Sequence, residues 1–208
     1  MNRRAMTRVR MRAACLAGSL ALSLSLLACK PIEPKAGAQP PLAGAKLGGD
    51  FTLVDKDGKP VRWADFAGKY RIVYFGYTFC PDVCPLDLQK LAQGLKLVEQ
   101  RVPLVAARIQ PIFITVDPQR DTPQVVGEFT SAFSPRLLGL TGSDDQVKAA
   151  EKAFAVYARK QDGGSGGGYL MDHSRIAYLM DRDGKPLALL PVDQTPQAIA
   201  TEIERWTS

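Results

Sequence analysis

The chain has 208 residues, with 27 lysines and arginines, 21 aspartates and glutamates, and a formal net charge of +6. Five arginines lie within the first 12 positions, so the rest of the chain holds 22 basic against 21 acidic residues and is nearly neutral. This balance excludes a nucleic-acid-binding surface, which requires a net basic patch. The length suits a single domain with a core of its own.

The N-terminus has the pattern of an export signal. An acid-free stretch with five arginines precedes an apolar run over 13–28, which ends in Ala28 immediately before Cys29. This arrangement is typical of a signal peptide, and a cysteine directly after the cleavage site indicates a lipoprotein. We therefore predict a signal peptide over 1–28, lipidation of Cys29, and a domain anchored to the membrane on its extracytoplasmic, periplasmic side. A retained anchor helix and plain secretion stay open, although 16 apolar residues are fewer than the roughly 20 needed to span a bilayer.

Residues 29–49 are expected to form a linker. Prolines alternate there with glycines and alanines, and apolar residues show no regular period. Proline-rich linkers are extended, so this segment would hold the domain away from its anchor. The remaining residues, 50–208, are expected to form the domain itself.

The first half of this domain predicts three strands and a helix. Residues 51–54 have a strand pattern, and Asp57-Gly58 is a hairpin turn signal. The β-branched and aromatic run over 71–77 indicates a buried central strand, and 111–116 indicates another. Between these two, apolar residues recur at largely helical spacing from Leu86 to Val98, and we expect this helix to end before Pro103.

The second half adds short strands and three more helices. Thr122 is predicted to cap a helix that begins at Pro123. Ser143 begins a capping box for the next helix, whose buried face is expected to run through Phe154 to Tyr157. Further strands are expected over 137–140, 176–180 and 187–190, and a last helix over 196–206. This order is typical of a thioredoxin-like α/β domain, with helices flanking a central mixed sheet.

A pair of cysteines lies between the central strand and the helix that follows it. Cys80 and Cys84 enclose Pro81-Asp82-Val83, so three residues separate them, whereas thioredoxin-type enzymes have two. The start of a helix favours thiolate over thiol. The wider spacing fits two ligands that converge on one metal, although it does not forbid a disulfide. The pair is therefore interpreted as a metal or redox site, since a domain of this size does not require a disulfide to fold.

His173 is the only histidine in the chain. Two thiols and one imidazole are a ligand set that favours copper. We expect His173 to lie outside a strand, directly after a glycine-rich loop over 163–168 that lets it move. Undocking of His173 would then leave the metal two ligands and allow its transfer, so shortening this loop is expected to slow transfer.

Three motifs resemble those of the Sco/SenC family. They are the run over 75–85 that contains both cysteines, Val116-Asp-Pro-Gln-Arg-Asp-Thr-Pro123, and Asp172-His-Ser174 running into residues 176–184. The likeness covers roughly residues 48–207 and keeps the order of the motifs. Two features depart from the family pattern: a longer stretch around 104–108 and the glycine-rich loop over 163–168.

The resemblance implies a membrane-tethered copper-binding protein with a thioredoxin-like fold. Such proteins deliver copper to the CuA site of cytochrome c oxidase during its assembly, or keep the cysteines of that site reduced. By this likeness Cys80, Cys84 and His173 would be the copper ligands. The implied partners are the CuA-bearing subunit, other copper chaperones, a thioredoxin-like reductase, and the membrane through the N-terminal lipid.

Both oxidation states of copper are considered. Cu(I) is satisfied by two thiolates and an imidazole, whereas Cu(II) prefers a tetragonal set that a water or a carboxylate must complete. Asp82 and Asp172 are the candidate carboxylates, and the sequence does not choose between them. Met171 is interpreted as a gap-filling residue.

Other functions stay open. A thiol–disulfide reductase acting on the oxidase or on other exported proteins would use Cys80 and Cys84 as its redox pair but has little use for His173. A zinc hydrolase is disfavoured because no dedicated general base accompanies the ligands. A metallochaperone with accessory thiol–disulfide activity therefore remains the leading interpretation. The loop over 117–123 is interpreted as a structural turn or as a docking rim on which Arg120 is exposed.

Overall fold

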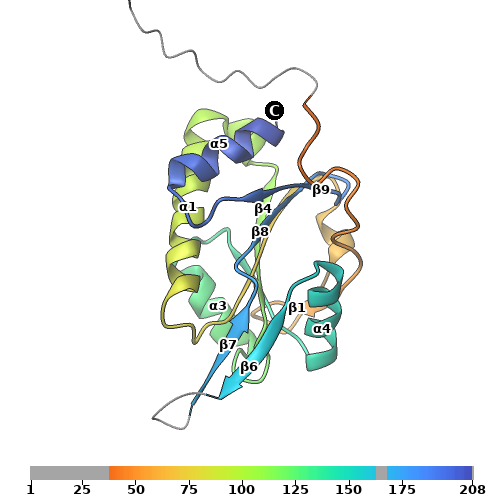
Figure 1. Ribbon diagram of the computed structural model, residues 1–208, viewed down its shortest axis with the longest axis vertical. Coiled ribbons are helices and arrows are strands. Elements are labelled where there is room, and N and C mark those ends of the chain that lie inside the picture. Colours follow the sequence, from red (N-terminus) through yellow and green to blue (C-terminus); the bar gives the residue numbers. More distant parts are fainter. Residues whose placement is uncertain (1–37, 163–167, 208) are drawn as a thin grey trace, which may run out of the picture. The chain divides into compact units, whose positions relative to one another are not determined.

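The centre of the fold is a buried strand, β3 (Tyr70–Gly76), in a five-stranded sheet of order β5-β4-β3-β8-β9. In this computed structural model, residues 38–162 and 168–207 are described. β3 runs parallel to β4 (Ile109–Thr115), which is parallel to β5 (Leu138–Leu140). On its other side β3 is antiparallel to β8 (Ala177–Met180), which pairs with β9 (Pro186–Leu190). The sheet is therefore mixed, as expected (Figure 1).

Alternate residues of β3 build two separate layers of core. The Tyr74 ring stacks near Phe113 on β4, and Phe113 meets Phe129 of α3 (Pro123–Ser131). α1 (Val83–Arg101) and α5 (Pro196–Thr207) cover the same face and approach closely at Gly94, where a Cβ atom would lie 2.9 Å from the Ile199 side chain. Successive strand residues point to opposite faces, so Tyr74 faces these helices and Phe75 faces away from them.

The opposite face of the sheet carries an aromatic cluster. Phe75 contacts Phe154, and Phe154 also contacts Trp63 and Tyr178. This layer is formed by α4 (Asp144–Ala153), the 3-10 helix η1 (Trp63–Phe66) and the antiparallel pair β1 (Thr52–Val54) and β2 (Pro60–Arg62). Both faces of β3 are thus covered, as for the central strand of an α/β domain.

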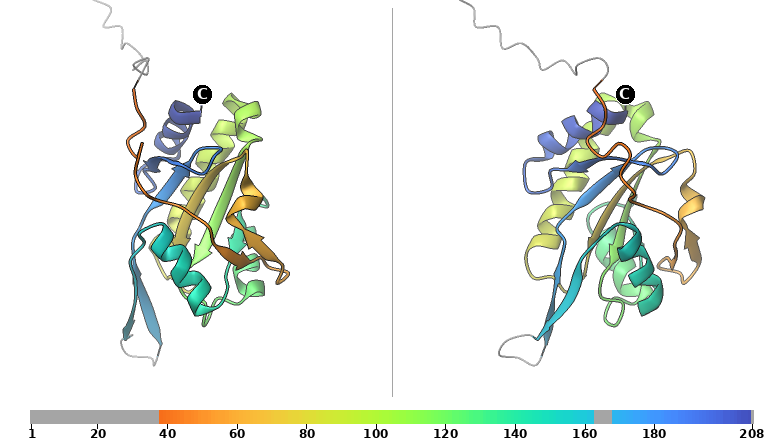
Figure 2. Two further views of the ribbon diagram at one scale, coloured as in Figure 1. Left: turned by 90° about the vertical axis from the view of Figure 1, so that its right-hand side faces the viewer. Right: turned by 45° about the vertical axis from the view of Figure 1, so that its right-hand side comes forward.

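A two-stranded antiparallel ribbon projects from the end of the sheet at which α1 begins (Figures 1 and 2). It is formed by β6 (Ala158–Asp162) and β7 (Tyr169–His173). The sequence analysis did not predict it, because neither strand has a continuous apolar run. The inward residues of β7 are half-buried and alternate with exposed ones, as in a ribbon with one covered face.

The other predicted elements are confirmed within a few residues. Thr122 caps α3 by accepting a hydrogen bond from the Val125 N–H, and Ser143 forms its capping box with Gln146. One expectation is wrong: α4 ends at Ala153, so Tyr157 is not on its buried face and is 53% exposed. A short helix, α2 (Pro103–Ala106), follows α1 in the longer stretch noted in the sequence.

The end of the expected linker contacts the domain. The Leu42 N–H donates to the Leu187 carbonyl, and the Gly48 N–H donates to the Ala153 carbonyl. The predicted signal peptide over 1–28 and the lipidation site Cys29 lie outside the described residues.

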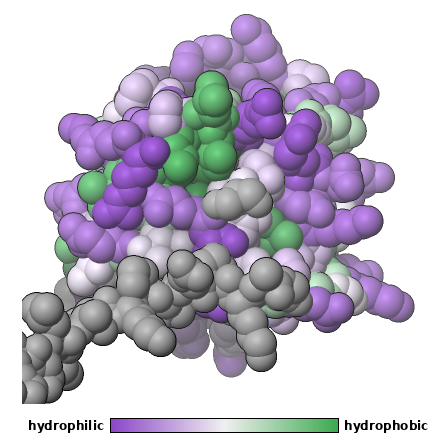
Figure 3. Space-filling view, turned by 90° about the horizontal axis from the view of Figure 1, so that it is seen from above, coloured by the Kyte–Doolittle hydropathy of each residue, from purple (hydrophilic) through white to green (hydrophobic). Residues whose placement is uncertain are grey.

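Figure 3 shows the end of the molecule that lies at the top of Figure 1. The surface there is largely hydrophilic and contains an apolar patch. Exposed large apolar side chains on the described part of the domain include Leu104, Leu189 and Leu86. Among the described helices, none is both long and apolar enough to cross a membrane.

The C-terminus of α4 offers a test of the fold. Ala155 has a positive φ of 52°, and the hydrogen bonds Val156 N–H to Glu151 O and Ala155 N–H to Lys152 O form a Schellman motif. Glycine is favoured at this position because it lacks the Cβ penalty. Ala155→Gly is therefore expected to raise the free energy of unfolding by about 0.5–1 kcal/mol, after allowing for the greater freedom of the unfolded chain.

Urea denaturation of the two proteins measures this difference. Ala149→Gly is the matched control, since Ala149 is an exposed residue within α4, and it should lower stability by about 1 kcal/mol. Equal losses in both variants would show that position 155 is not under strain.

Candidate metal and thiol site

The cysteine loop begins where β3 ends. Gly76 is the last residue of β3, and a Cβ atom there would lie 3.1 Å from the Cys84 sulfur. The missing side chain lets the first turn of α1 pack directly on the strand. Cys84 is the second residue of α1, and Pro85 follows within the first turn, where a missing N–H costs no helical bond.

The two cysteines are free thiols in unlike environments. Cys80 is 9% exposed and Cys84 is fully buried. A hydrogen bond from the Cys84 thiol, together with those from the backbone N–H groups of Cys84 and Asp82, lowers the pKa of Cys80 to about 3. The same interaction with Cys80, together with burial, raises the pKa of Cys84. The pair therefore consists of an accessible thiolate and a buried thiol.

His173 lies at this pair. Its Nε2 is 3.4 Å from the Cys84 sulfur, although 89 residues separate the two in the sequence. Its Nδ1 is 3.1 Å from the Ser174 carbonyl oxygen. Since a carbonyl only accepts, the neutral ring must carry its proton on Nδ1, which leaves the Nε2 lone pair facing the sulfur. The ring also meets Tyr77 edge-on, with centroids 5.9 Å apart.

The expectation that His173 lies outside a strand is wrong. His173 is the last residue of β7 and pairs with Ala158, whereas Tyr169 at the other end pairs with Asp162. Asp162 and Tyr169 therefore lie at the opposite end of the ribbon from His173, and residues 163–167, on which the expected movement of the ring was based, lie outside the described residues. Any movement of the ring would have to involve the ribbon or the bonds that hold it.

The donor atoms fit a soft metal ion. With metal–sulfur and metal–nitrogen bonds of about 2.3 and 2.0 Å, a trigonal site places the two donor atoms about 3.7 Å apart. The observed separation of Cys84 sulfur and Nε2 is 3.4 Å, close to this value. Within residues 38–162 and 168–207, no three His, Cys, Asp or Glu side chains already enclose a metal position, so binding by all three candidates requires a small adjustment.

The two candidate carboxylates are not beside the ring. Asp172 precedes His173 on β7 and is exposed, so it belongs to the opposite face of the ribbon from the half-buried Tyr169, Met171 and His173. Asp82 is also exposed, and its backbone N–H, not its carboxylate, acts on Cys80. Met171 packs partly against the core, as expected of a gap-filling residue.

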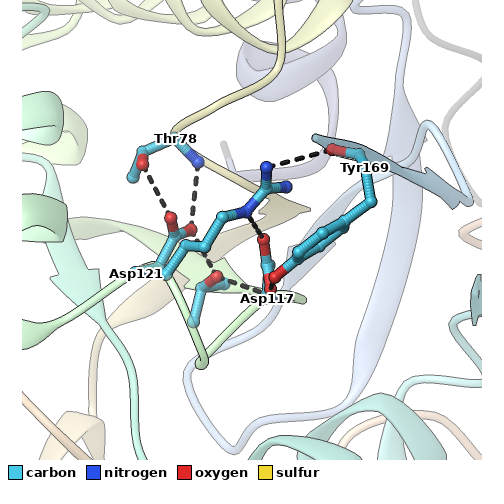
Figure 4. Close-up of polar contacts among 6 residues, drawn as sticks. Thr78, Asp117, Asp121 and Tyr169 are labelled. Carbon is cyan, nitrogen blue, oxygen red and sulfur yellow. Dashed lines mark hydrogen bonds and ion pairs between the residues drawn. The ribbon is translucent and has the colours of Figure 1, made fainter. Parts of the chain in front are cut away.

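The loop after β4 holds the cysteine loop in place (Figure 4). Asp121 is fully buried and accepts hydrogen bonds from the Thr78 N–H and from the Thr78 and Thr115 hydroxyls. Burial raises the pKa of the Asp121 carboxyl. Thr78 lies two residues before Cys80, so this network fixes the approach to the first thiol.

Arg120 belongs to the same loop. The interpretation of Arg120 as an exposed rim residue is wrong. Its side chain is 23% exposed, pairs with the buried Asp117 at 2.5 Å, and donates to the Tyr169 carbonyl (Figure 4). It also stacks on the Tyr169 ring at 3.7 Å and lies over Phe79. Arg120 therefore joins the loop after β4 to the base of β7.

A buried ion pair beside the site was missed by the sequence analysis. Asp87 is fully buried one turn after Cys84, and Arg175 donates two hydrogen bonds to its carboxylate, at 2.7 and 2.5 Å. The Tyr74 hydroxyl donates a third, at 3.0 Å. An aspartate on the apolar face of the predicted helix was the available signal, since buried carboxylates are nearly always paired.

The comparisons with known proteins identify the family of this chain. A family profile described as SCO1/SenC matches residues 39–208. The chain belongs to the SCO1/SenC family. The SCO2-like protein of Rickettsia felis is 38% identical over 184 residues, which are 88% of this chain and 87% of that protein. Protein SenC of Rhodobacter capsulatus is 40% identical over 161 residues, covering 77% and 71%.

The solved structure of a relative has the same fold as this chain. The structure of Bradyrhizobium japonicum ScoI with copper bound matches 77% of this chain and 99% of that chain, with 38% identity and a TM-score of 0.69. The thioredoxin-like fold and the Sco/SenC resemblance predicted from the sequence are therefore confirmed.

The unlike environments of the thiols predict unlike reactivity. At pH values below its pKa, an ordinary thiol reacts about tenfold faster for each unit by which the pH is raised, because the thiolate is the nucleophile. With its pKa lowered to about 3, Cys80 is already ionised above that pH, so its alkylation rate should stay nearly constant between about pH 5 and pH 8. Cys84 should react far more slowly throughout, because it is buried and its pKa is raised.

Iodoacetamide labelling of the reduced protein, followed by mass spectrometry of the two sites, measures both rates. Cys84→Ala removes the hydrogen-bond donor and should restore a rise of Cys80 labelling with pH. A tenfold rise per pH unit in the unsubstituted protein would contradict the assignment.

Proposed function

We propose that this protein binds copper through Cys80, Cys84 and His173 and delivers it to the CuA-bearing subunit of cytochrome c oxidase during assembly. The observation that carries the proposal is the approach of the His173 Nε2 lone pair to the Cys84 sulfur, beside a second free thiol. Membership of a family in which ScoI has been solved with copper bound supports it.

The donor set favours Cu(I) as the cargo. Two sulfur donors and one imidazole satisfy Cu(I), and the ionised Cys80 sulfur needs no proton to leave before it binds. Cu(II) prefers a tetragonal set. Since Asp82 and Asp172 are both exposed and lie apart from the ring, water is the better supported fourth ligand.

The exposure of the site suits transfer to a partner. Cys80 is the more accessible sulfur, and Phe79 beside it is 51% exposed, so an incoming thiol would meet this edge first. The sequence pattern of 1–29 supports a tether on the periplasmic side of a membrane, with Cys29 lipidated. Other copper chaperones and a thioredoxin-like reductase would supply the metal and keep the thiols reduced.

A thiol–disulfide reductase is the second candidate, and the asymmetry of the thiols favours it. Cys80 is a thiolate and the less buried of the two sulfurs, and a thiolate of this kind beside a fully buried thiol resembles an attacking and a resolving cysteine. The two functions share the reduced pair and differ in their need for His173.

Substitution of His173 separates the two functions. His173→Ala removes the imidazole donor, and the Cu(I) affinity should fall by at least ten- to a hundredfold, the loss that even an outer partner of a metal ligand can cause. Competition with a chromophoric Cu(I) chelator measures the change. Met171→Leu is the matched control, because Met171 lies two residues earlier on the same face of β7, and its affinity should not change.

Exchange with a small aromatic disulfide gives the complementary measurement. The His173→Ala protein should still react through Cys80, whereas Cys80→Ala should not. Undiminished Cu(I) affinity in His173→Ala would overturn the proposed ligand set and favour the reductase.

A further inference from the structure

Two cross-links join the same pair of segments at the site. Cys84 meets His173, and Asp87 meets Arg175. Cys84 and Asp87 are three residues apart on α1 and so share one face of the helix. His173 and Arg175 are two residues apart where β7 ends, and the side chains of both reach α1. The second contact therefore repeats the first, one helical turn further along α1.

The second cross-link is the stronger one. The Asp87 carboxylate is fully buried and accepts both nitrogens of the Arg175 fork, an arrangement that fixes direction as well as distance. By contrast, Nε2 contacts the Cys84 sulfur at 3.4 Å, and sulfur is a weak hydrogen-bonding partner. A fixed Arg175 would thus set the position of a ring that is only weakly held by its own contacts.

Tyr74 connects the ion pair to the thiol. Its hydroxyl donates to Asp87 at 3.0 Å and also contacts Cys84. Tyr74 belongs to the buried strand β3, which is a rigid support. The carboxylate of Asp87 is thereby fixed from β3 and α1 together, while Arg175 is 39% exposed and reaches in from outside.

We infer that the Arg175–Asp87 pair is a strap that holds His173 against the cysteines, with Arg175 as a positioning residue. The strap limits the freedom of the end of β7, where the ring must stay for three-donor binding. Its opening is the movement that frees His173. The part of this inference that concerns copper rests on the proposed function, whereas the part that concerns the ring does not.

A metal-free measurement tests the strap directly. His173 is the only histidine, so isotope labelling of histidine gives the signals of a single ring. In the reduced full-length protein we expect the Nδ1–H tautomer and a nuclear Overhauser contact with Tyr77. In Arg175→Gln the nitrogen shifts should move toward the average of a free imidazole, and the contact with Tyr77 should weaken.

A second variant protects the test against misfolding. Arg175→Gln leaves a buried carboxylate without its cation, so the double variant Asp87→Asn/Arg175→Gln is made as well, in which the amide keeps an acceptor for Tyr74. Both should release the ring to the same extent, since either loses the whole strap. Arg175→Lys, which retains the charge but not the fork, should restore part of the wild-type signal.

Arg101→Gln is the matched control. It removes an ion pair with Glu204 that also joins α1 to a C-terminal segment, but about 21 Å along the helix from Asp87. This variant is expected to lose a little stability, but its His173 signals should not change. Unaltered tautomer and Tyr77 contact in both Arg175→Gln and the double variant would overturn the strap.

Copper titration of the same proteins separates the two hypotheses. If the strap acts on binding, the Cu(I) affinity of Arg175→Gln and of the double variant should fall by about ten- to a hundredfold. If the unsubstituted protein binds no Cu(I) while the ring still responds to Arg175→Gln, the proposed function fails and the strap stands. If the unsubstituted protein binds Cu(I) with His173 and neither variant changes ring or affinity, the strap fails alone.

Discussion

The site depends on the burial of β3 on both faces. Helices cover its Tyr74 side and an aromatic layer covers its Phe75 side, so the strand cannot shift without disrupting both. The chain leaves this strand at Gly76, and the absence of a side chain there lets α1 approach until the Cys84 sulfur touches the sheet. One sulfur is thus packed against the strand that both layers of the core hold in place.

Around that fixed sulfur, the remaining groups are held with different firmness. Asp121 ties the approach to Cys80 through Thr78, and Arg120 ties the base of β7 through Tyr169. His173 itself is held by contacts with the Ser174 carbonyl, the Cys84 sulfur and the edge of Tyr77. Cys80 and His173 are therefore positioned by residues close to them in the sequence, Thr78 and Arg175, which are themselves firmly hydrogen-bonded. Such an arrangement keeps a site ordered and still lets it exchange its ligand.

The sequence predicted most of the fold because its elements follow local rules. The apolar run of β3, the caps at Thr122 and Ser143 and the turn at Asp57-Gly58 each act within a few residues. The ribbon of β6 and β7 was missed because β7 buries only one of its faces, and that face only partly. Its sequence therefore shows no strong alternation of apolar and polar residues. The ligand candidates were found from residue type and motif, whereas Arg175 was not, since its role depends on a partner 88 residues away.

Disulfide exchange requires a thiol that a partner can attack or be attacked by, whereas metal binding requires both thiols to hold an ion. The position of His173 is compatible with both functions. A dithiol that exchanges with other proteins needs one sulfur that is easier to reach than the other, and Cys80, 9% exposed, is easier to reach than the fully buried Cys84. The ring meets the more buried of the two sulfurs, with its Nε2 3.4 Å from Cys84. An incoming thiol can therefore approach Cys80 while His173 stays on Cys84. In this order of contacts, the partner would bind the ion beside Cys80 before His173 is released. A soft ion would then pass between the two proteins without being left in water with a single ligand.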